Sequence, residues 1–372
     1  MRATQFQHGS FTVADVPEAP APGPGQIRID VAACGICGSD LSMSKDPGRF
    51  VHVAENAGYP LATFDTDRPV VLGHEYAGVV RELGSDVTDF AVGDRVAGIG
   101  LATDTSSGIP TIIGYSNEYH GAFGEHIVVD ASWVRQVPDK LSLEHATLAE
   151  PLHVGEMHVQ QSGLTAADSA LVIGCGSIGL GAIIAAKARG VPVIASEPAP
   201  KRRELAAALG ADVVVDPAEN DPIEVYNRMV AEGNPLVGQG GPGILIAYEC
   251  SGRAGILGTL LHTLPFNSRI QVLAAPFDDE VIVPVVGQFR RIAVNFGHGP
   301  YENAYDITLQ RLADGEIDAE AIITGRVCLD DVADAFAALR QPDEHVKILV
   351  LPGTTTHSPR AAGGNIDAPS NA

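Results

Sequence analysis

Residues 170–190 read ALVIGCGSIGLGAIIAAKARG and contain the pattern that decides the fold. An apolar run is followed by Gly174, Gly176 and Gly179 in the spacing G-x-G-x-x-G, and then by Ala, Ile and Leu residues at helical period. The pattern predicts a buried strand, a tight turn and a helix. Gly174 suits the tight turn, which other residues resist. Gly176 lets the backbone approach a pyrophosphate, and Gly179 lets the helix pack closely on the strand.

The same stretch predicts a dinucleotide site. The free N–H groups and positive dipole end of the helix, at Gly176-Ser177-Ile178-Gly179, would face the phosphates. A second apolar strand, residues 191–195, is followed by Glu197, whose carboxylate would accept hydrogen bonds from the adenosine ribose. The alternative is a glycine-rich turn that arose by chance, but the strand and the acid stand where a dinucleotide site needs them.

Composition limits the class of protein. The chain has 372 residues, 45% hydrophobic and 19% charged, which is typical of a soluble globular protein of one or two domains. The net charge of −22 argues against nucleic acid or an anionic membrane as a partner. The N-terminus lacks the apolar core of a signal peptide, and the five cysteines are too sparse for a disulfide framework. We therefore expect a cytoplasmic protein.

Apolar runs divide the chain into two predicted domains. Short extended runs separated by glycine turns predict a β-rich first domain. From residue 170 strands and helices alternate, which predicts an α/β domain with a doubly wound parallel sheet. A last strand at residues 347–351 is expected to return to the first domain. The predicted division is residues 1–155 with 298–353 for the first domain, 156–297 for the dinucleotide-binding domain, and 354–372 for a disordered tail.

Three further segments could together form a metal site. Cys37 lies in a glycine-rich segment, His74 and Glu75 follow Gly73, and Glu150 begins a helical region. A thiolate, an imidazole and a carboxylate suit a catalytic zinc, which takes three protein ligands and leaves one position open. On spacing alone, each residue could equally be a turn cysteine, a capped histidine or a helix-start glutamate.

Taken together, these motifs resemble those of a known family. The chain is similar to the medium-chain dehydrogenase/reductases, and within them to the zinc-dependent alcohol, polyol and threonine dehydrogenase branch, over about residues 1–353. The resemblance implies a GroES-like catalytic domain beside a Rossmann domain. The matching motifs, in order, are Cys37-x-Ser39-Asp40, Gly73-His74-Glu75-x-x-Gly78, Gly93-Asp94-Arg95-Val96, Glu150-Pro151-Leu152 and the turn at Gly174.

The resemblance implies a metal-ligand set. Cys37 and His74 would bind zinc, and Glu150 would be the third ligand, as glutamate is in polyol-type relatives. Glu75 would be a neighbour that in some relatives joins the metal or exchanges with a ligand, so the resemblance leaves open which carboxylate binds directly. The second cysteine of Cys34-x-x-Cys37 alone binds metal in the family, so Cys34 is expected to be structural.

The resemblance also implies catalytic roles. Ser39 would take the substrate proton, and Asp40 would orient a metal ligand by hydrogen bonding. Relatives often carry a histidine at the end of the proton relay, and this chain has Ser42 at that position. The group that takes the proton onwards could therefore be Ser42, water or His52.

Two segments depart from the family pattern. Relatives with a structural zinc carry four closely spaced cysteines in the region of residues 99–124, and this region has none, so we expect one zinc per chain. The connection from Asp40 to His74 is unusually long, and we expect a flap over the substrate pocket, with a plain surface excursion as the alternative.

For the cofactor, the resemblance places Arg202 near the adenosine and Ser251 beside the nicotinamide ribose, and Lys347 loosely matches a residue that contacts the pyrophosphate. Glu197 favours NAD because a carboxylate would repel the 2′-phosphate of NADP. Arg202 and Arg203 keep NADP open as the less favoured cofactor.

The predicted function is reversible oxidation of a secondary alcohol, bulky or cyclic because residues 40–74 are rich in apolar and aromatic side chains. The alternatives are a zinc-free, NADPH-dependent reductase of activated double bonds on the same scaffold, and a non-catalytic nucleotide-binding protein. The expected partners are a small-molecule alcohol or carbonyl compound and further copies of the chain, as a homodimer or homotetramer.

Overall fold

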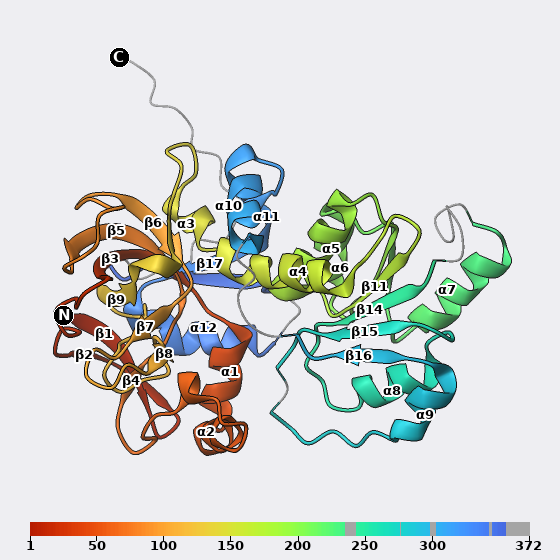
Figure 1. Cartoon of the computed structure of the whole chain (residues 1–372), viewed down its shortest axis with the longest axis horizontal. Coiled ribbons are helices and arrows are strands. Elements are labelled where there is room, and N and C mark those ends of the chain that lie inside the picture. Colours follow the sequence, from red (N-terminus) through yellow and green to blue (C-terminus); the bar gives the residue numbers. More distant parts are fainter. Residues whose placement is uncertain (235–242, 276, 298–302, 342–343, 355–372) are drawn as a thin grey trace, which may run out of the picture.

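The computed structural model describes residues 1–234, 243–275, 277–297, 303–341 and 344–354. Two lobes lie side by side, with the N-terminus in one of them and helix α4 between the two (Figure 1). The predicted tail, apart from its first residue, lies outside the described residues.

The first lobe is built on antiparallel strands. Its largest sheet also takes in the last two strands of the described chain, because β18 pairs with β3 through Leu349 and Gly35. The C-terminal part therefore returns to the first lobe, as expected, although the predicted domain boundaries themselves stay predictions. The sheets contain, in spatial order, β2 (Ser10–Asp15), β1 (Arg2–Gln7) and β4 (Val70–Val71); β10 (Val134–Gln136), β6 (Arg95–Gly98), β5 (Glu75–Leu83), β3 (Gln26–Gly35), β18 (Lys347–Val350) and β17 (Ile323–Val327), with β9 (His126–Asp130) paired to β3; and β7 (Leu101–Thr103) with β8 (Pro110–Ile112).

The second lobe contains a parallel sheet with helices on both faces. In the central strand β11, Ala170 and Val172 belong to one buried cluster, whereas Leu171 and Ile173 belong to another on the opposite face. A strand buried on both faces needs the continuous apolar run that the sequence shows. The described strands are, in spatial order, β13 (Val213–Val215), β12 (Val193–Ser196), β11 (Ser169–Ile173), β14 (Leu245–Glu249), β15 (Arg269–Val272) and β16 (Ala293–Asn295).

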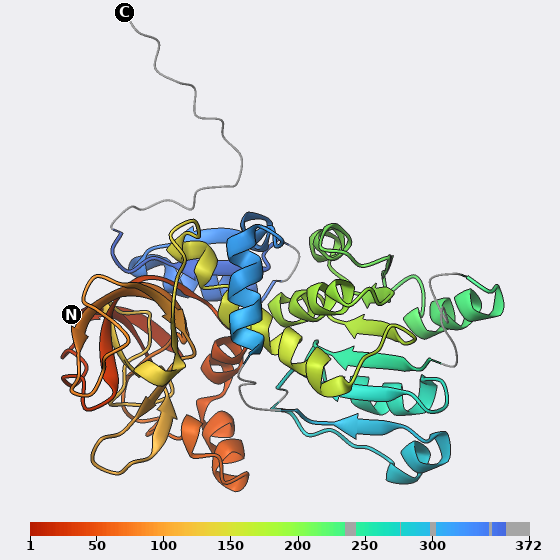
Figure 2. The ribbon, with the colours of Figure 1, turned by 45° about the horizontal axis from the view of Figure 1, so that its top comes forward.

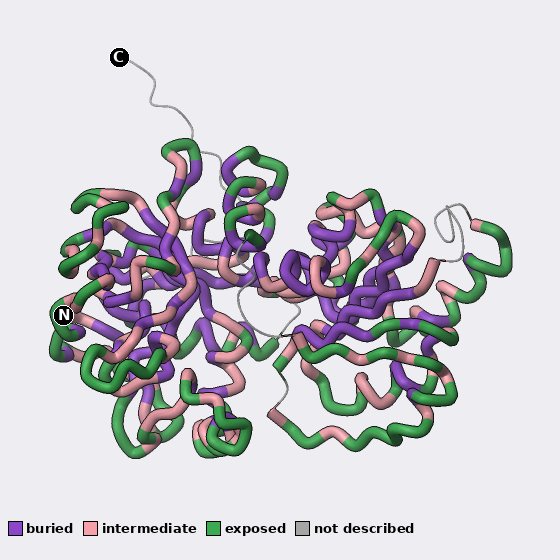
Figure 3. The backbone as a smooth tube through the Cα atoms, in the orientation of Figure 1, coloured by how far each residue is buried: buried purple, intermediate pink, exposed green. Residues whose placement is uncertain are grey.

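Helices cover the sheets and fill the space between the lobes, where α10 stands beside α4 (Figure 2). Buried residues concentrate inside each lobe, while the chain around α9 and β16 is largely exposed or intermediate (Figure 3). The helices are α1 (Gly38–Lys45), α2 (Pro47–Asn56), α3 (Leu143–Ala146), α4 (Ala149–Ser162), α5 (Ser177–Ala188), α6 (Pro200–Ala208), α7 (Pro222–Ala231), α8 (Ile256–Thr263), α9 (Pro284–Arg290), α10 (Ala304–Asp314), α11 (Ala319–Ile322) and α12 (Val332–Leu339).

The long connection between Asp40 and His74 is more ordered than the loop that the sequence suggested. It contains the end of α1, all of α2 and a short 3₁₀ turn, η1 (Pro60–Ala62). Helix α2 begins where Pro47 takes the first helical position and the side chain of Asp46 accepts a hydrogen bond from the Arg49 N–H at 2.9 Å. Capping and a buried face therefore make this segment helical.

Candidate active site

Helix α1 places three of the predicted site residues together. Cys37 immediately precedes the helix, and its N–H donates to Oδ2 of Asp40 at 3.0 Å, so that the carboxylate satisfies a free group of the helix N-terminus. The Ser39 hydroxyl donates to Sγ of Cys37 at 3.1 Å. The order Cys-Gly-Ser-Asp is thus a capped first turn that aims a thiol and a hydroxyl at the same space.

His74 reaches this turn from the residue before β5. Its Nδ1 lies 3.6 Å from Oδ1 of Asp40, and its side chain is hydrogen-bonded to Cys37. Burial by itself lowers the pKa of the imidazole, but the Asp40 charge and the bond to Cys37 outweigh burial and leave the pKa well above its ordinary value. The structure therefore brings His74, Asp40 and Cys37 together.

Glu150 approaches from the first turn of α4. Burial raises the pKa of its carboxyl to about 7, against the opposing effect of His74, and the Glu75 charge raises it further. Glu150 is thus an electrostatic neighbour of His74, although 76 residues separate them in the chain.

The donor set of Cys37, His74 and Glu150 fits zinc in its chemistry, since it offers one sulfur, one nitrogen and one oxygen. The three side chains are also close enough to interact, because His74 is hydrogen-bonded to Cys37 and interacts electrostatically with Glu150. Among the described residues, however, no group of three His, Cys, Asp or Glu side chains is arranged so that it could hold a metal ion. The ligand set therefore stays a prediction.

Glu75 has a different partner. Lys347, on β18, donates to both carboxylate oxygens at 2.8 and 2.7 Å and to the Ile36 carbonyl at 2.9 Å. Both side chains are almost wholly buried. The predicted contact of Lys347 with the pyrophosphate is therefore wrong, because its ammonium group points into the first lobe. A Cβ on Gly35 would lie 2.0 Å from Oε2 of Glu75, so any other residue there would displace the Glu75 carboxylate from its position beside Lys347.

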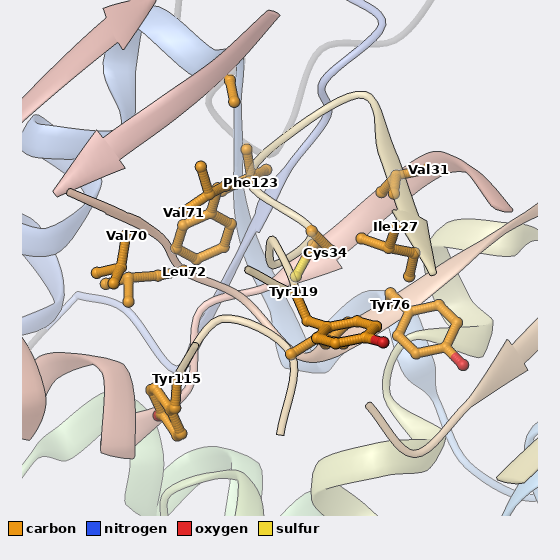
Figure 4. Close-up of a cluster of buried hydrophobic side chains, with 14 of the residues drawn as sticks. Val31, Cys34, Val70, Val71, Leu72, Tyr76, Tyr115, Tyr119, Phe123 and Ile127 are labelled. Atoms are coloured by element: carbon orange, nitrogen blue, oxygen red, sulfur yellow. The ribbon is translucent and has the colours of Figure 1, made fainter. Parts of the chain in front are cut away.

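Tyr115 is a site residue that the sequence did not reveal. It lies between β8 and β9, at the margin of the apolar cluster of the first lobe (Figure 4). Its Oη is 2.8 Å from Oγ of Ser39 and 3.1 Å from Oδ1 of Asp40. No motif surrounds it, so only its spatial position identifies it.

The glycine turn has the features that a dinucleotide needs. Gly174 has a φ of +90°, and a Cβ on it would lie 2.9 Å from the backbone of Ser251. A Cβ on Gly179 would lie 1.9 Å from the Gly174 carbonyl oxygen, whereas a Cβ on Gly176 would meet no described atom within 4 Å. The turn is therefore tight on its inner side and open at the N-terminus of α5, where Ser177 and Ile178 begin the helix.

Glu197 and Arg202 flank this turn. The Glu197 carboxylate accepts from the N–H groups of Cys175 at 2.7 Å and Ala199 at 2.9 Å, so it helps to hold the turn. Arg202 donates to the carbonyl of His345 at 3.0 Å and so links α6 to the segment before β18. The structure thus brings Glu197 to the turn and Arg202 to the junction of the lobes.

Helix α2 of the first lobe contacts the segment that follows β15 in the second. Arg49 donates from Nε to the Phe277 carbonyl at 2.9 Å and pairs with Asp279 at 2.6 Å. The ring of Phe50 lies between those of Tyr115 and Phe277, with centroid distances of 4.9 and 4.6 Å. Phe277 follows the carboxyl end of β15, the edge at which open parallel sheets bind ligands. The position of α2 favours the expected flap over a plain surface excursion.

Two family models match the chain at these parts of the fold. Residues 23–139 match the alcohol dehydrogenase GroES-like domain, and residues 177–311 match the zinc-binding dehydrogenase domain. The chain belongs to the zinc-type medium-chain dehydrogenase family. The predicted family, fold class and alcohol dehydrogenase activity are therefore confirmed. The match to a zinc-binding dehydrogenase disfavours the zinc-free reductase.

Relatives of this alcohol dehydrogenase match nearly all of it. The (R,R)-butanediol dehydrogenase of Neisseria gonorrhoeae is 32% identical over 95% of this chain and 99% of its own length. The sorbitol dehydrogenase of Bacillus subtilis is 29% identical over 88% and 90%. The crystal structure of 2R,3R-butanediol dehydrogenase from Bacillus subtilis superposes with a TM-score of 0.76 at 30% identity, over 95% and 99% of the two chains. Within the described part of the chain, every helix is too short or too polar to cross a membrane.

Proposed function

We propose that this dehydrogenase interconverts a small vicinal diol and its hydroxyketone, with NAD as the cofactor. The observation that carries the proposal is the convergence of Cys37, Ser39 and His74 in one partly buried cluster. Relatives that match nearly the whole chain are named for butane-2,3-diol, a vicinal diol, and for sorbitol, a polyol with hydroxyl groups on adjacent carbons. A bulky or cyclic alcohol, expected from the sequence, is the second candidate, and the aromatic rings of Phe50 and Tyr115 favour it.

Cys37, His74 and Glu150 would hold the zinc in this proposal. Glu150 is preferred over Glu75 because both oxygens of Glu75 are already engaged by Lys347. When bound, zinc supplies Lewis-acid polarisation of the substrate oxygen, which lowers the pKa of the alcohol. Asp40 would orient the His74 ring.

Ser39 would take part in proton transfer, and the glycine turn would bind the dinucleotide. The Ser39 oxygen would accept the substrate's hydroxyl proton while the serine passes its own proton on to water or a neighbouring side chain. The turn from Gly174 to Gly179, with Ser251 packed against it, would hold the dinucleotide so that its nicotinamide meets the substrate. Bound NAD supplies the hydride acceptor.

A panel of alcohols with both cofactors tests the proposal. We expect turnover of butane-2,3-diol with NAD to exceed that of cyclic or terpenoid alcohols, as followed by cofactor absorbance. Faster turnover of cyclic alcohols would favour the second candidate. A wild-type enzyme with bound zinc and NAD that oxidises no member of the panel would contradict the proposed activity.

Cofactor choice is predicted to depend on Glu197. Its carboxylate stands beside the turn and would repel a 2′-phosphate, so Glu197→Ala should reduce the preference for NAD over NADP by about tenfold or more, since one lost charge interaction of roughly 1.4 kcal/mol is tenfold. The preference is measured as the ratio of kcat/KM values for the two cofactors. Glu204→Ala removes an exposed carboxylate from α6, the helix that follows Glu197, and serves as the control. An unchanged ratio in Glu197→Ala would refute the assignment.

We also propose that two copies associate along β16. This strand is the last of its sheet in the described chain, and unpaired strand edges readily pair with another chain. Large apolar side chains are exposed around it, among them Val281 at 89%, Phe289 at 75% and Phe296 at 65%. Light scattering should give a dimer or tetramer for the wild type, and Phe289→Asp should shift it towards monomer. Val92→Asp, on the other lobe and 66% exposed, should not.

The cytoplasmic location stays a proposal. All five cysteines are free thiols, which suits a reducing compartment.

A further inference from the structure

Tyr115 is held firmly beside the proposed proton-accepting group. The side chain is buried, and its ring packs between His74, at a centroid distance of 5.3 Å, and Phe50, at 4.9 Å. This packing fixes the phenol oxygen 2.8 Å from Oγ of Ser39. The hydroxyl therefore has a set position that does not depend on the Ser39 contact alone.

The hydrogen bonds around Tyr115 limit where its single proton can go. Oδ2 of Asp40 already accepts from the Cys37 N–H, while Oδ1 lies 3.1 Å from the Tyr115 hydroxyl. The Tyr115 hydroxyl has one proton to donate, and its shorter contact is the one to Oγ of Ser39, at 2.8 Å against 3.1 Å for Oδ1 of Asp40. Ser39 thus accepts from Tyr115 and donates its own proton to Sγ of Cys37.

We propose that Tyr115 is a positioning residue that orients the Ser39 hydroxyl towards the substrate. With one lone pair accepting from Tyr115 and its proton directed to Cys37, the Ser39 oxygen turns its other lone pair to the open side of the site, where the substrate hydroxyl would arrive. The inference rests on the proposed function of Ser39.

The sequence suggested His52 and Ser42 as partners of Ser39 in the proton relay, and neither is placed as Tyr115 is. His52 lies on the exposed face of α2, where its Nε2 is 2.9 Å from Nδ2 of Asn56. Ser42 occupies the position at which relatives often carry a relay histidine. The Tyr115 hydroxyl, by contrast, is within hydrogen-bond distance of Ser39, so it is the better supported second partner.

Tyr115→Phe tests the inference, because it keeps the ring contacts and removes the hydroxyl. We expect kcat to fall roughly tenfold, a part of the hundredfold or more that a positioned proton-transfer group contributes, with zinc content and KM for NAD unchanged. Tyr119→Phe is the matched control, since the Tyr119 hydroxyl bonds the Thr103 carbonyl away from Ser39. An unchanged kcat in Tyr115→Phe would overturn the inference.

A double-mutant cycle separates positioning of Ser39 from other effects. If Tyr115 acts through Ser39, Tyr115→Phe should cause no further loss in a Ser39→Ala background. The same tenfold loss in that background would show that Tyr115 acts on something else and would overturn the inference.

Crystal structures of the wild type and of Tyr115→Phe give a readout that does not require turnover. The Ser39 side chain is expected to rotate so that Oγ faces only Cys37 in the variant. If no alcohol is oxidised by the wild type, the proposed function fails, yet the rotation still supports positioning. An unmoved Ser39 Oγ would overturn the inference whatever the activity of the enzyme.

Discussion

Cys37→Ser is expected to strip the zinc from the enzyme and to lower kcat about a thousandfold, since a Lewis acid supplies several kcal/mol of transition-state stabilisation. Cys37 is partly buried and its thiol contacts Ser39 and His74. A serine hydroxyl is a much poorer zinc ligand than a thiolate, so the variant should fold but lose the metal. Zinc per chain, measured by plasma mass spectrometry, and kcat are the two readouts.

The matched control for this experiment is Cys34→Ala, three residues earlier. Cys34 is fully buried on β3, and burial, helped by the charges of Asp40 and Glu75, raises the pKa of its thiol well above the usual value. A thiol that resists ionisation is a poor metal ligand. The variant should therefore keep its zinc. Loss of zinc in Cys34→Ala with retention in Cys37→Ser would reverse the two assignments.

The parts of the fold that the sequence predicted are those with local signals. The turn at Gly174 needs a positive φ and close contacts, and each requirement selects glycine at a fixed spacing. The buried strand before it needs apolar residues on both faces. Such features are encoded within about twenty residues and do not depend on distant parts of the chain.

The features that the sequence did not predict depend on contacts between distant segments. Lys347 was expected at the pyrophosphate, but it lies buried against Glu75, 272 residues earlier in the chain. Tyr115 contacts Ser39 across 76 residues, and Arg49 contacts Asp279 across 230. Neither Tyr115 nor Arg49 lies in a recognisable motif, because its contact partner comes close only in the tertiary structure.

Lys347→Met is predicted to destabilise the enzyme by about 3–5 kcal/mol, the usual effect of removing one member of a buried ion pair. The variant leaves the Glu75 carboxylate buried without its cation and frees the Ile36 carbonyl of its donor. Burial by itself lowers the pKa of the Lys347 ammonium, but Glu75 outweighs burial and the pKa is raised. Lys347 is therefore charged at neutral pH, and the stability that its raised pKa contributes is lost as the pH rises through that pKa. The midpoint of thermal unfolding of the metal-free protein is the measurement.

Two further variants distinguish an unpaired charge from a simple loss of packing. Adding Glu75→Gln to Lys347→Met removes the uncompensated carboxylate, so the double variant should unfold at a higher temperature than Lys347→Met alone. Lys140→Met breaks an exposed ion pair with Asp314 of similar length, 2.6 Å, and should change stability by less than about 1 kcal/mol. If Lys347→Met unfolded at the wild-type temperature, Glu75 would not need its cation. Lys347 would then not hold Glu75 away from the metal, and Glu150 would lose its preference as the ligand.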